Sequence, residues 1–252
     1  VKSTFPRKLS LEGLKIAIDC ANGAAYKVAP EILWELGADV VPFGVEPNGK
    51  NINDGCGSTA TELLQKMTVS QKCNIGIGLD GDADRVLICD ENGKLIDGDQ
   101  IMGLLAREWV KKEKLKGGGI VATVMSNLGL ERYVEGLDLK FIRSPVGDRY
   151  VAEKMKEYNC NLGGEQSGHI IFGDYATTGD GLVGGLQVLA LLVELGQQAS
   201  DICRVFDPVP QMLKNVKYDR NQPLDPKKVE SITNEGEAAL GSGGRLLVRA
   251  SG

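Results

Sequence analysis

Apolar and polar residues alternate along the chain in patterns that predict short strands separated by helices. Compact apolar runs predict strands over residues 14–20, 39–43, 75–79, 86–89, 120–125 and 140–143. Apolar residues spaced three and four positions apart predict amphipathic helices over about 28–36, 60–70 and 101–109, with further helices that end near residues 158 and 196. This alternation of strands and helices is typical of α/β folds with a largely parallel sheet.

The pattern restarts in the second half of the chain, after a charged and glycine-rich connection. The strand over 120–125 and the turn over 126–129 repeat the order and the turn chemistry of residues 16–23. Such similarity within one chain indicates two units built from one plan. We therefore expect an α/β fold of two similar domains with mixed, largely parallel sheets, plus a truncated α+β C-terminal piece. The predicted domains are residues 1–94, 95–206 and 207–252.

Local signals also predict where particular elements begin and end. Gly37 is predicted to follow the end of the first helix, because glycine adopts the left-handed conformation found there. Thr59 and Glu62 have the spacing of a capping box at the start of the second helix. The C-terminal piece is predicted to contain, after a proline-containing linker, one helix and one strand, over about 226–240 and 245–248.

Three carboxylates alternate with very small residues between two apolar runs. They belong to Asp80, Asp82 and Asp84, and Arg85 follows at once. Like charges this close repel one another unless a cation lies among them, and oxygen ligands suit Mg²⁺ or Ca²⁺. Alternate side chains of a strand lie roughly 6.5–7 Å apart, so one ion can contact all three only where the backbone curls. The sequence predicts a metal loop at the end of a buried strand, where open α/β sheets bind ligands.

Two other interpretations of this loop are an EF-hand and a solvated acidic turn. Asp80, Asp82, Asp84 and Glu91 fall at EF-hand loop positions 1, 3, 5 and 12. The position that needs glycine holds Arg85, however, and the flanking residues have the pattern of strands. The apolar flanks also argue against a solvated turn, because they place the loop at the mouth of a core element.

Two further clusters of polar residues have the chemistry of a binding site. Glu165, Ser167 and His169 alternate, so on an extended backbone they would share one face, and His169 is the only histidine of the chain. An acceptor, a hydroxyl and an imidazole side by side suit sugar hydroxyls or an amine, although a polar edge strand explains the pattern as well. Arg249 and Ser251, beside glycine, have the donors that grip a phosphate.

Composition limits the classes of partner. The 252 residues are 42% hydrophobic and 25% charged, with a net charge of −5, which is ordinary for a globular protein. Nothing indicates a nucleic-acid or membrane surface. The six cysteines contain no CxxC pair, and we expect them to be reduced and mostly buried. We therefore expect a cytoplasmic protein that is a monomer or a homodimer and binds neither nucleic acid nor membrane.

Together, these motifs resemble the α-D-phosphohexomutase superfamily. The resemblance rests on residues 80–85, 164–169 and 249–252 in this order and spacing, with supporting runs at 19–23, 51–59 and 146–150. It implies four domains around a central cleft, of which this chain resembles domains two and three plus a truncated domain four. It also implies Mg²⁺ and a phosphoserine that exchanges its phosphoryl group with a sugar phosphate. The serine-bearing loop of the superfamily's first domain is absent from this chain.

The resemblance also implies a role for each cluster of polar residues. The superfamily pattern places the metal ligands on Asp80, Asp82 and Asp84, and the catalytic arginine on Arg85. It places the substrate-binding residues on Glu165, Ser167, His169, Asp148 and Arg149. It places the phosphate-binding residues on Arg249, Ser251 and Gly252.

Within the superfamily, the chain is most similar to the branch that acts on glucosamine phosphates, which fits Ala83 in the metal loop. The implied reaction interconverts glucosamine 6-phosphate and glucosamine 1-phosphate through a bisphosphate, for amino-sugar nucleotide and cell-wall precursor synthesis. The alternatives are mannose or glucose phosphate as substrate, or a non-catalytic fragment that binds sugar phosphate and Mg²⁺. We expect this chain alone to be inactive. An aspartyl-phosphate phosphatase is a third class, but its lysine and Ser/Thr find no convincing counterpart.

Overall fold

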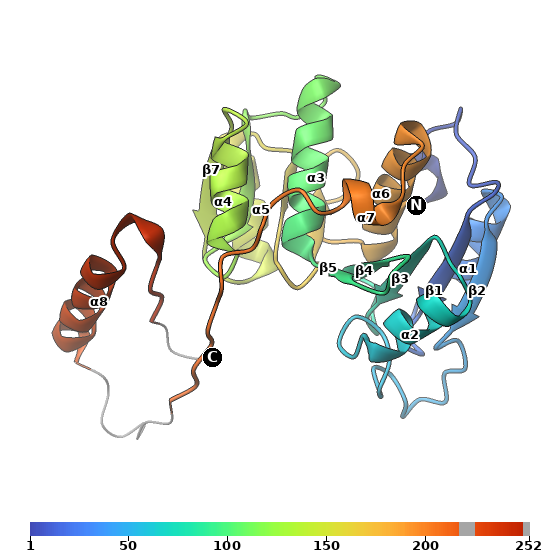
Figure 1. The fold of residues 1–252 in the computed structure, drawn as a ribbon, viewed down its shortest axis with the longest axis horizontal. Helices are drawn as coiled ribbons and strands as arrows, with labels where there is room; N and C mark the ends of the chain where they lie inside the picture. The colour runs from blue at the N-terminus through green and yellow to red at the C-terminus, as the bar shows by residue number, and fades with distance from the viewer. Residues whose placement is uncertain (217–224, 249–252) are drawn as a thin grey trace.

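The computed structural model describes residues 1–216 and 225–248, which form two α/β units and a C-terminal helix (Figure 1). The first sheet has the strand order β2-β1-β3-β4-β5, and the second has the order β7-β6-β8-β9. The strands are Lys15–Asp19 (β1), Asp39–Phe43 (β2), Ile75–Leu79 (β3), Val86–Asp90 (β4), Leu95–Ile96 (β5), Gly119–Thr123 (β6), Lys140–Ser144 (β7), Leu162–Gly164 (β8) and Ile170–Phe172 (β9).

Both sheets are mixed, as the sequence predicted. The pairs β1–β2, β1–β3, β6–β7 and β6–β8 are parallel, whereas β3–β4, β4–β5 and β8–β9 are antiparallel. The helices are Val28–Glu35 (α1), Glu62–Ser70 (α2), Gly98–Lys111 (α3), Leu128–Glu135 (α4), Asp148–Tyr158 (α5), Gly181–Leu195 (α6), Ala199–Ile202 (α7) and Pro226–Leu240 (α8), and Lys2–Thr4 and Gly241–Gly243 form 3₁₀ turns.

The internal repeat is confirmed by the topology. The succession β1-α1-β2-α2-β3-β4 in the first unit corresponds to β6-α4-β7-α5-β8-β9 in the second. The strand orders also correspond, because the first strand of each unit lies between the second and the third, and the fourth is antiparallel to the third. The connection β3–β4 in the first unit is therefore equivalent to the connection β8–β9 in the second.

The central strand β3 is buried on both faces. On one face, a Cβ atom at Gly76 would lie 2.2 Å from Oγ1 of Thr68 in α2, so this position admits only glycine without rearrangement. On the other face, a Cβ atom at Gly185 of α6 would lie 3.4 Å from Ile77. Helix α6 also contacts α3, and α3 contacts β6 and β8, so one apolar core continues from the first sheet through these two helices to the second (Figure 1).

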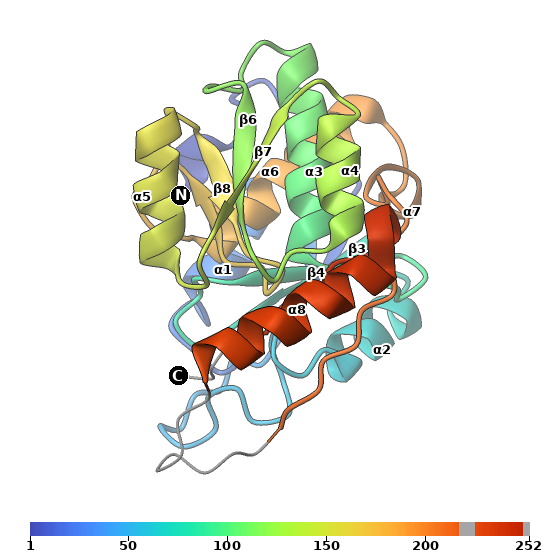
Figure 2. The same cartoon turned by 90° about the vertical axis from the view of Figure 1, so that its left-hand side faces the viewer.

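Several local predictions can be checked directly. Gly37 follows the last residues of α1 with a φ of 102°, as expected. The capping box is wrong, because α2 begins at Glu62 behind Thr61, and no side chain caps it. In the C-terminal piece, α8 covers the predicted residues, but no strand forms over 245–248. Helix α8 stands apart from both units in Figure 1 and lies in front of them in Figure 2, and none of its described residues is buried.

All six cysteines are free and buried, as expected. No helix among residues 1–216 and 225–248 combines the length and the apolar composition that crossing a bilayer requires.

The two units also meet through backbone contacts, where the β8–β9 turn lies along the start of β4. The Val86 N–H donates to the Gly168 carbonyl at 3.0 Å, and Arg85 forms an isolated antiparallel bridge with His169. Gly168 has a φ of 93°, and a Cβ atom there would lie 2.1 Å from the Val86 carbonyl oxygen. Only glycine satisfies both the backbone conformation and this close approach.

Replacement of Gly168 by alanine should therefore destabilise the chain by more than the strain of placing an alanine in this left-handed backbone conformation. The matched control is Gly196→Ala at the end of α6, where φ is 61° but nothing lies within 4 Å of an added Cβ. The control should lose about 1–2 kcal/mol, and Gly168→Ala about 1–3 kcal/mol more, because its methyl group overpacks a backbone contact. Thermal unfolding followed by circular dichroism compares the two, and equal midpoints would contradict the contact.

Candidate functional site

The predicted metal loop connects β3 to β4 and curls as a metal site requires. Ala83 adopts a left-handed conformation with a φ of 62°, and its N–H donates to the Asp80 carbonyl at 3.1 Å. One carboxylate oxygen each of Asp80, Asp82 and Asp84 lies within 4.8 Å of the others. Strands flank the loop on both sides, so the EF-hand interpretation is wrong.

The loop holds more negative charge than its protein partners neutralise. Burial raises the pKa of Asp80, the N–H of Arg85 lowers it, and the charges of Asp84 and Asp82 raise it again. The Arg85 guanidinium Nε lies 3.5 Å from Asp80 Oδ2 and 3.8 Å from Asp84 Oδ1. Asp84 Oδ1 is buried and accepts no hydrogen bond among the described residues. A hard divalent cation fits this set of oxygen ligands, and Asp84 Oδ1 would then coordinate it.

His169 orients one of these carboxylates. Its Nδ1 lies 3.1 Å from Asp84 Oδ2, and its Nε2 accepts the Gly179 N–H at 3.0 Å. Because Nε2 accepts this bond, the ring's hydrogen lies on Nδ1 and points at the carboxylate. The ring is only 5% exposed. His169 is expected among the substrate-binding residues, and in the structure both of its nitrogens have protein partners, Asp84 and Gly179.

A glycine segment at the start of α6 supports the loop from the second unit. The Gly181 N–H donates to the Ala83 carbonyl at 2.9 Å. A Cβ atom at Gly179 would lie 2.8 Å from the Asp84 carbonyl oxygen, and one at Gly181 would lie 2.3 Å from that of Arg85. Sequence reasoning missed these two glycines. The signal that could have found them is their spacing around Asp180, the N-cap of α6.

The β1–α1 turn supports the loop from the first unit. The Ala24 N–H donates to the Gly81 carbonyl at 2.7 Å, and a Cβ atom at Gly23 would lie 2.2 Å from the same oxygen. Asp19 shapes this turn, because its carboxylate accepts the N–H groups of Ala21 at 2.9 Å and of Gly57 at 2.7 Å. Burial is the main cause of the raised pKa of Asp19.

The second predicted cluster forms a turn, not the extended face that alternation suggested. The Glu165 N–H donates to the His169 carbonyl at 2.9 Å, and the Gly168 N–H donates to the Glu165 carbonyl at 3.0 Å. Ser167 is exposed and donates from Oγ to Glu165 Oε2 at 3.3 Å. Glu165 is half-buried, and its Oε1 accepts the Gly147 N–H at 2.9 Å. These two side chains therefore form a polar surface beside the loop that precedes α5.

The remaining predicted residues lie at the start of α5 or outside the description. Asp148 and Arg149 are exposed, and the Arg149 guanidinium pairs with Glu153 at 2.9 Å. The contact of Gly147 with Glu165 brings this end of α5 beside the β8–β9 turn. The phosphate-binding prediction for Arg249, Ser251 and Gly252 lies outside the described residues.

Comparison with known families shows the family of the chain. Residues 2–93 match the α/β/α domain II of the phosphoglucomutase/phosphomannomutase family, and residues 97–209 match its α/β/α domain III. The chain therefore belongs to the phosphoglucomutase/phosphomannomutase family. The phosphoglucosamine mutase of Parvibaculum lavamentivorans is 60% identical over 252 residues, which are 100% of this chain and 56% of that relative. The chain thus spans little more than half the length of this relative.

Solved structures share the fold at lower identity. A phosphoglucomutase/phosphomannomutase family protein from Burkholderia thailandensis has a TM-score of 0.71 and 24% identity, covering 80% of this chain and 44% of its own. The N-acetylphosphoglucosamine mutase of Aspergillus fumigatus, solved in complex with GlcNAc-6P and magnesium, has a TM-score of 0.69 and 22% identity, covering 93% of this chain and 56% of its own. At these identities, the likeness shows the fold alone.

The metal interpretation predicts that Asp84→Asn weakens divalent-ion binding by the chain at least about tenfold, because one anionic ligand is lost. Titration with Mn²⁺, followed by electron paramagnetic resonance of the free ion, measures this directly. The control is Asp201→Asn, which changes an exposed carboxylate of α7. Equal affinities in the two variants would contradict the assignment of the loop as a metal site.

The orientation of Asp84 by His169 predicts a separate effect in the same titration. His169→Ala should weaken Mn²⁺ binding about 10-fold to 100-fold, as expected for partners that orient a ligand. His169→Gln keeps an N–H donor for the carboxylate and should recover part of the loss. Unchanged affinity in the alanine variant would show that the hydrogen bond from Nδ1 does not support the site.

Proposed function

We propose that this chain forms the metal-binding and sugar-binding middle part of a longer Mg²⁺-dependent phosphohexomutase. The reaction that we propose interconverts glucosamine 6-phosphate and glucosamine 1-phosphate through a bisphosphate. The observation that carries the proposal is that the three-aspartate loop and the Glu165–His169 turn lie against each other, joined by the bridge between Arg85 and His169. A phosphate held at the loop and a sugar held at the turn would then be neighbours.

The choice of glucosamine phosphate is supported by the relatives. The relative from Parvibaculum lavamentivorans, at 60% identity, carries the name phosphoglucosamine mutase. The structural neighbour from Aspergillus fumigatus was solved with GlcNAc-6P and magnesium, which is an amino-sugar phosphate with the proposed metal. The family as a whole also includes phosphoglucomutases and phosphomannomutases, so glucose and mannose phosphates are the natural competitors in a test.

Each group of the site has a distinct task in the proposed reaction. Phosphoryl transfer depends mainly on positioning and on stabilising the charge of the phosphoryl oxygens. Mg²⁺ supplies positive charge at the phosphoryl group when it is bound to Asp80, Asp82 and Asp84. The half-exposed Arg85 guanidinium, beside the same carboxylates, is placed to clamp that group. Glu165 then binds the sugar hydroxyls or the amine.

Ser167 is exposed next to Glu165 and adds a second polar contact for the sugar.

We place the phosphoryl-carrying serine in another part of the longer protein, because no serine of this chain has the sequence context of the superfamily's phosphoserine. This chain alone would then bind Mg²⁺ and sugar phosphate without turnover. We further propose that the longer protein works in the cytoplasm, in the synthesis of amino-sugar nucleotides.

In the longer protein, Asp82→Asn should lower turnover of glucosamine 6-phosphate by about 10³-fold, because a charge that stabilises the transferred phosphoryl group is lost with the metal. Asp82 is exposed, so the fold and its melting temperature should not change.

The wild-type protein should also show a higher kcat/KM for glucosamine 6-phosphate than for mannose or glucose 6-phosphate. Near-normal turnover in Asp82→Asn, or a preference for mannose phosphate, would contradict the proposal.

A further inference from the structure

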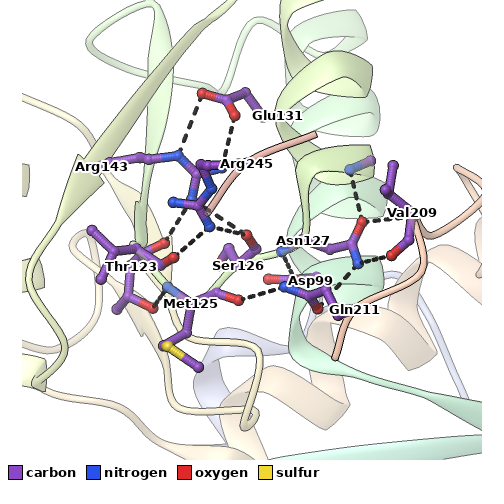
Figure 3. Close-up of polar contacts among 12 residues, drawn as sticks. Asp99, Thr123, Met125, Ser126, Asn127, Glu131, Arg143, Val209, Gln211 and Arg245 are labelled. Carbon is purple, nitrogen blue, oxygen red and sulfur yellow. Dashed lines mark hydrogen bonds and ion pairs between the residues drawn. The ribbon is translucent and has the colours of Figure 1, made fainter. Parts of the chain in front are cut away.

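A second network of polar contacts surrounds the β6–α4 turn, residues 123–127, and the proposed chemistry does not use it (Figure 3). Buried backbone carbonyls at the end of a strand need donors from elsewhere. Arg143 supplies two, because its Nη1 donates to the Thr123 carbonyl at 3.1 Å and to the Ser126 carbonyl at 3.3 Å. An ion pair with Glu131 at 2.7 Å holds this guanidinium in place.

Both ends of the described C-terminal piece contact this turn. At its start, the Asn127 side chain pairs with the backbone of Val209, accepting its N–H at 2.9 Å and donating to its carbonyl at 2.8 Å. Near its end, Arg245 Nη2 donates to the Val124 carbonyl at 2.5 Å and to the Ser126 carbonyl at 3.4 Å. Figure 3 shows Arg245 and the segment at Val209 reaching the turn from different directions. Two segments that are distant in sequence therefore share one anchor.

The turn is itself fixed by a buried carboxyl group. Asp99 Oδ2, at the start of α3, accepts the Asn127 N–H at 2.7 Å, and Asp99 is fully buried. Burial raises the pKa of Asp99 to about 7, against the lowering effect of that N–H. Asn127 Oδ1 also accepts the Gly129 N–H at 2.7 Å and so caps α4. The orientation of the Asn127 amide is thereby also fixed by contacts outside the C-terminal piece.

The same first turn of α3 also reaches the proposed sugar-binding turn. The Gly98 N–H donates to the Gln166 carbonyl at 3.0 Å. Gln100 holds the linker, near residues 205–210, as Asn127 does: it accepts the Val205 N–H and donates to the Phe206 carbonyl, each at 2.9 Å. Consecutive residues of one helical turn thus contact the sugar-binding turn on one side and the linker on the other.

We propose that the β6–α4 turn is a docking platform that positions the C-terminal piece relative to the sugar-binding turn, with Asn127 as its principal positioning residue. The proposal rests on the proposed function where it concerns the substrate. Helix α8 buries none of its described residues, so these polar contacts, and not an apolar interface of the helix, fix the piece. Loss of the platform should weaken sugar-phosphate binding without affecting the metal loop, which is built from other segments.

Hydrogen exchange measured by mass spectrometry on this chain tests the platform independently of activity. Asn127→Ala removes the acceptor of the Val209 N–H, so exchange in residues 204–211 should accelerate about tenfold. The matched control is Asn161→Ala, because Asn161 is also buried and its amide clamps the α3–β6 connection through Lys116 and Lys114. The control should leave exchange in 204–211 unchanged. Equal acceleration in both variants, or none in Asn127→Ala, would overturn the proposal.

Kinetics of the longer protein supply the second arm. Asn127→Ala should raise KM for glucosamine 6-phosphate several-fold while Mn²⁺ affinity stays at the wild-type value. Asn127→Asp keeps the acceptor for the Val209 N–H and should be intermediate. An unchanged KM, or a parallel loss of Mn²⁺ affinity, would overturn the positioning role. If the wild-type protein does not turn over glucosamine 6-phosphate, the proposed function fails, and the exchange comparison decides the platform by itself.

Discussion

The structure has to oppose the repulsion among three carboxylates, which have oxygens within 4.8 Å of one another. One arginine lies beside them, and one buried oxygen has no hydrogen-bond partner among the described residues. Rigid neighbours hold this loop closed against the repulsion, which a bound cation would neutralise. The glycines at 23, 168, 179 and 181 follow from this constraint, because each allows another backbone to approach the loop or the start of β4 more closely than a side chain permits.

The internal repeat gives this constraint an architectural solution. The β3–β4 loop of the first unit and the β8–β9 turn of the second are equivalent positions in one plan, and they face each other through the bridge between Arg85 and His169. The first copy carries the carboxylates. The second copy supplies the histidine that orients Asp84 and the polar surface of Glu165. The candidate site is therefore built from both connections.

The clustering of the three carboxylates could be predicted from sequence because Asp80, Asp82 and Asp84 lie within five residues and the flanking strands have a clear apolar pattern. The repeat was predictable for the same reason. The shape of the Glu165–His169 segment was not, because alternation predicts an extended face, whereas Gly168 turns the chain where Val86 of the other unit contacts it. The direction of His169 was missed because it depends on Gly179, which is ten residues away in sequence. The strand predicted over 245–248 is absent, since apolar pattern alone does not supply a partner strand.

Crystals of the chain grown with Mn²⁺ would test the central claim most directly, through the anomalous signal of the metal. The account predicts one strong peak at about 2.0–2.6 Å, the metal–oxygen bond length, from the carboxylates of Asp80, Asp82 and Asp84. The Nδ1 of His169 should keep its hydrogen bond to Asp84 Oδ2, the carboxylate oxygen that does not coordinate the ion. A map with no peak at this loop under saturating Mn²⁺, or with the three carboxylates turned apart, would contradict the account.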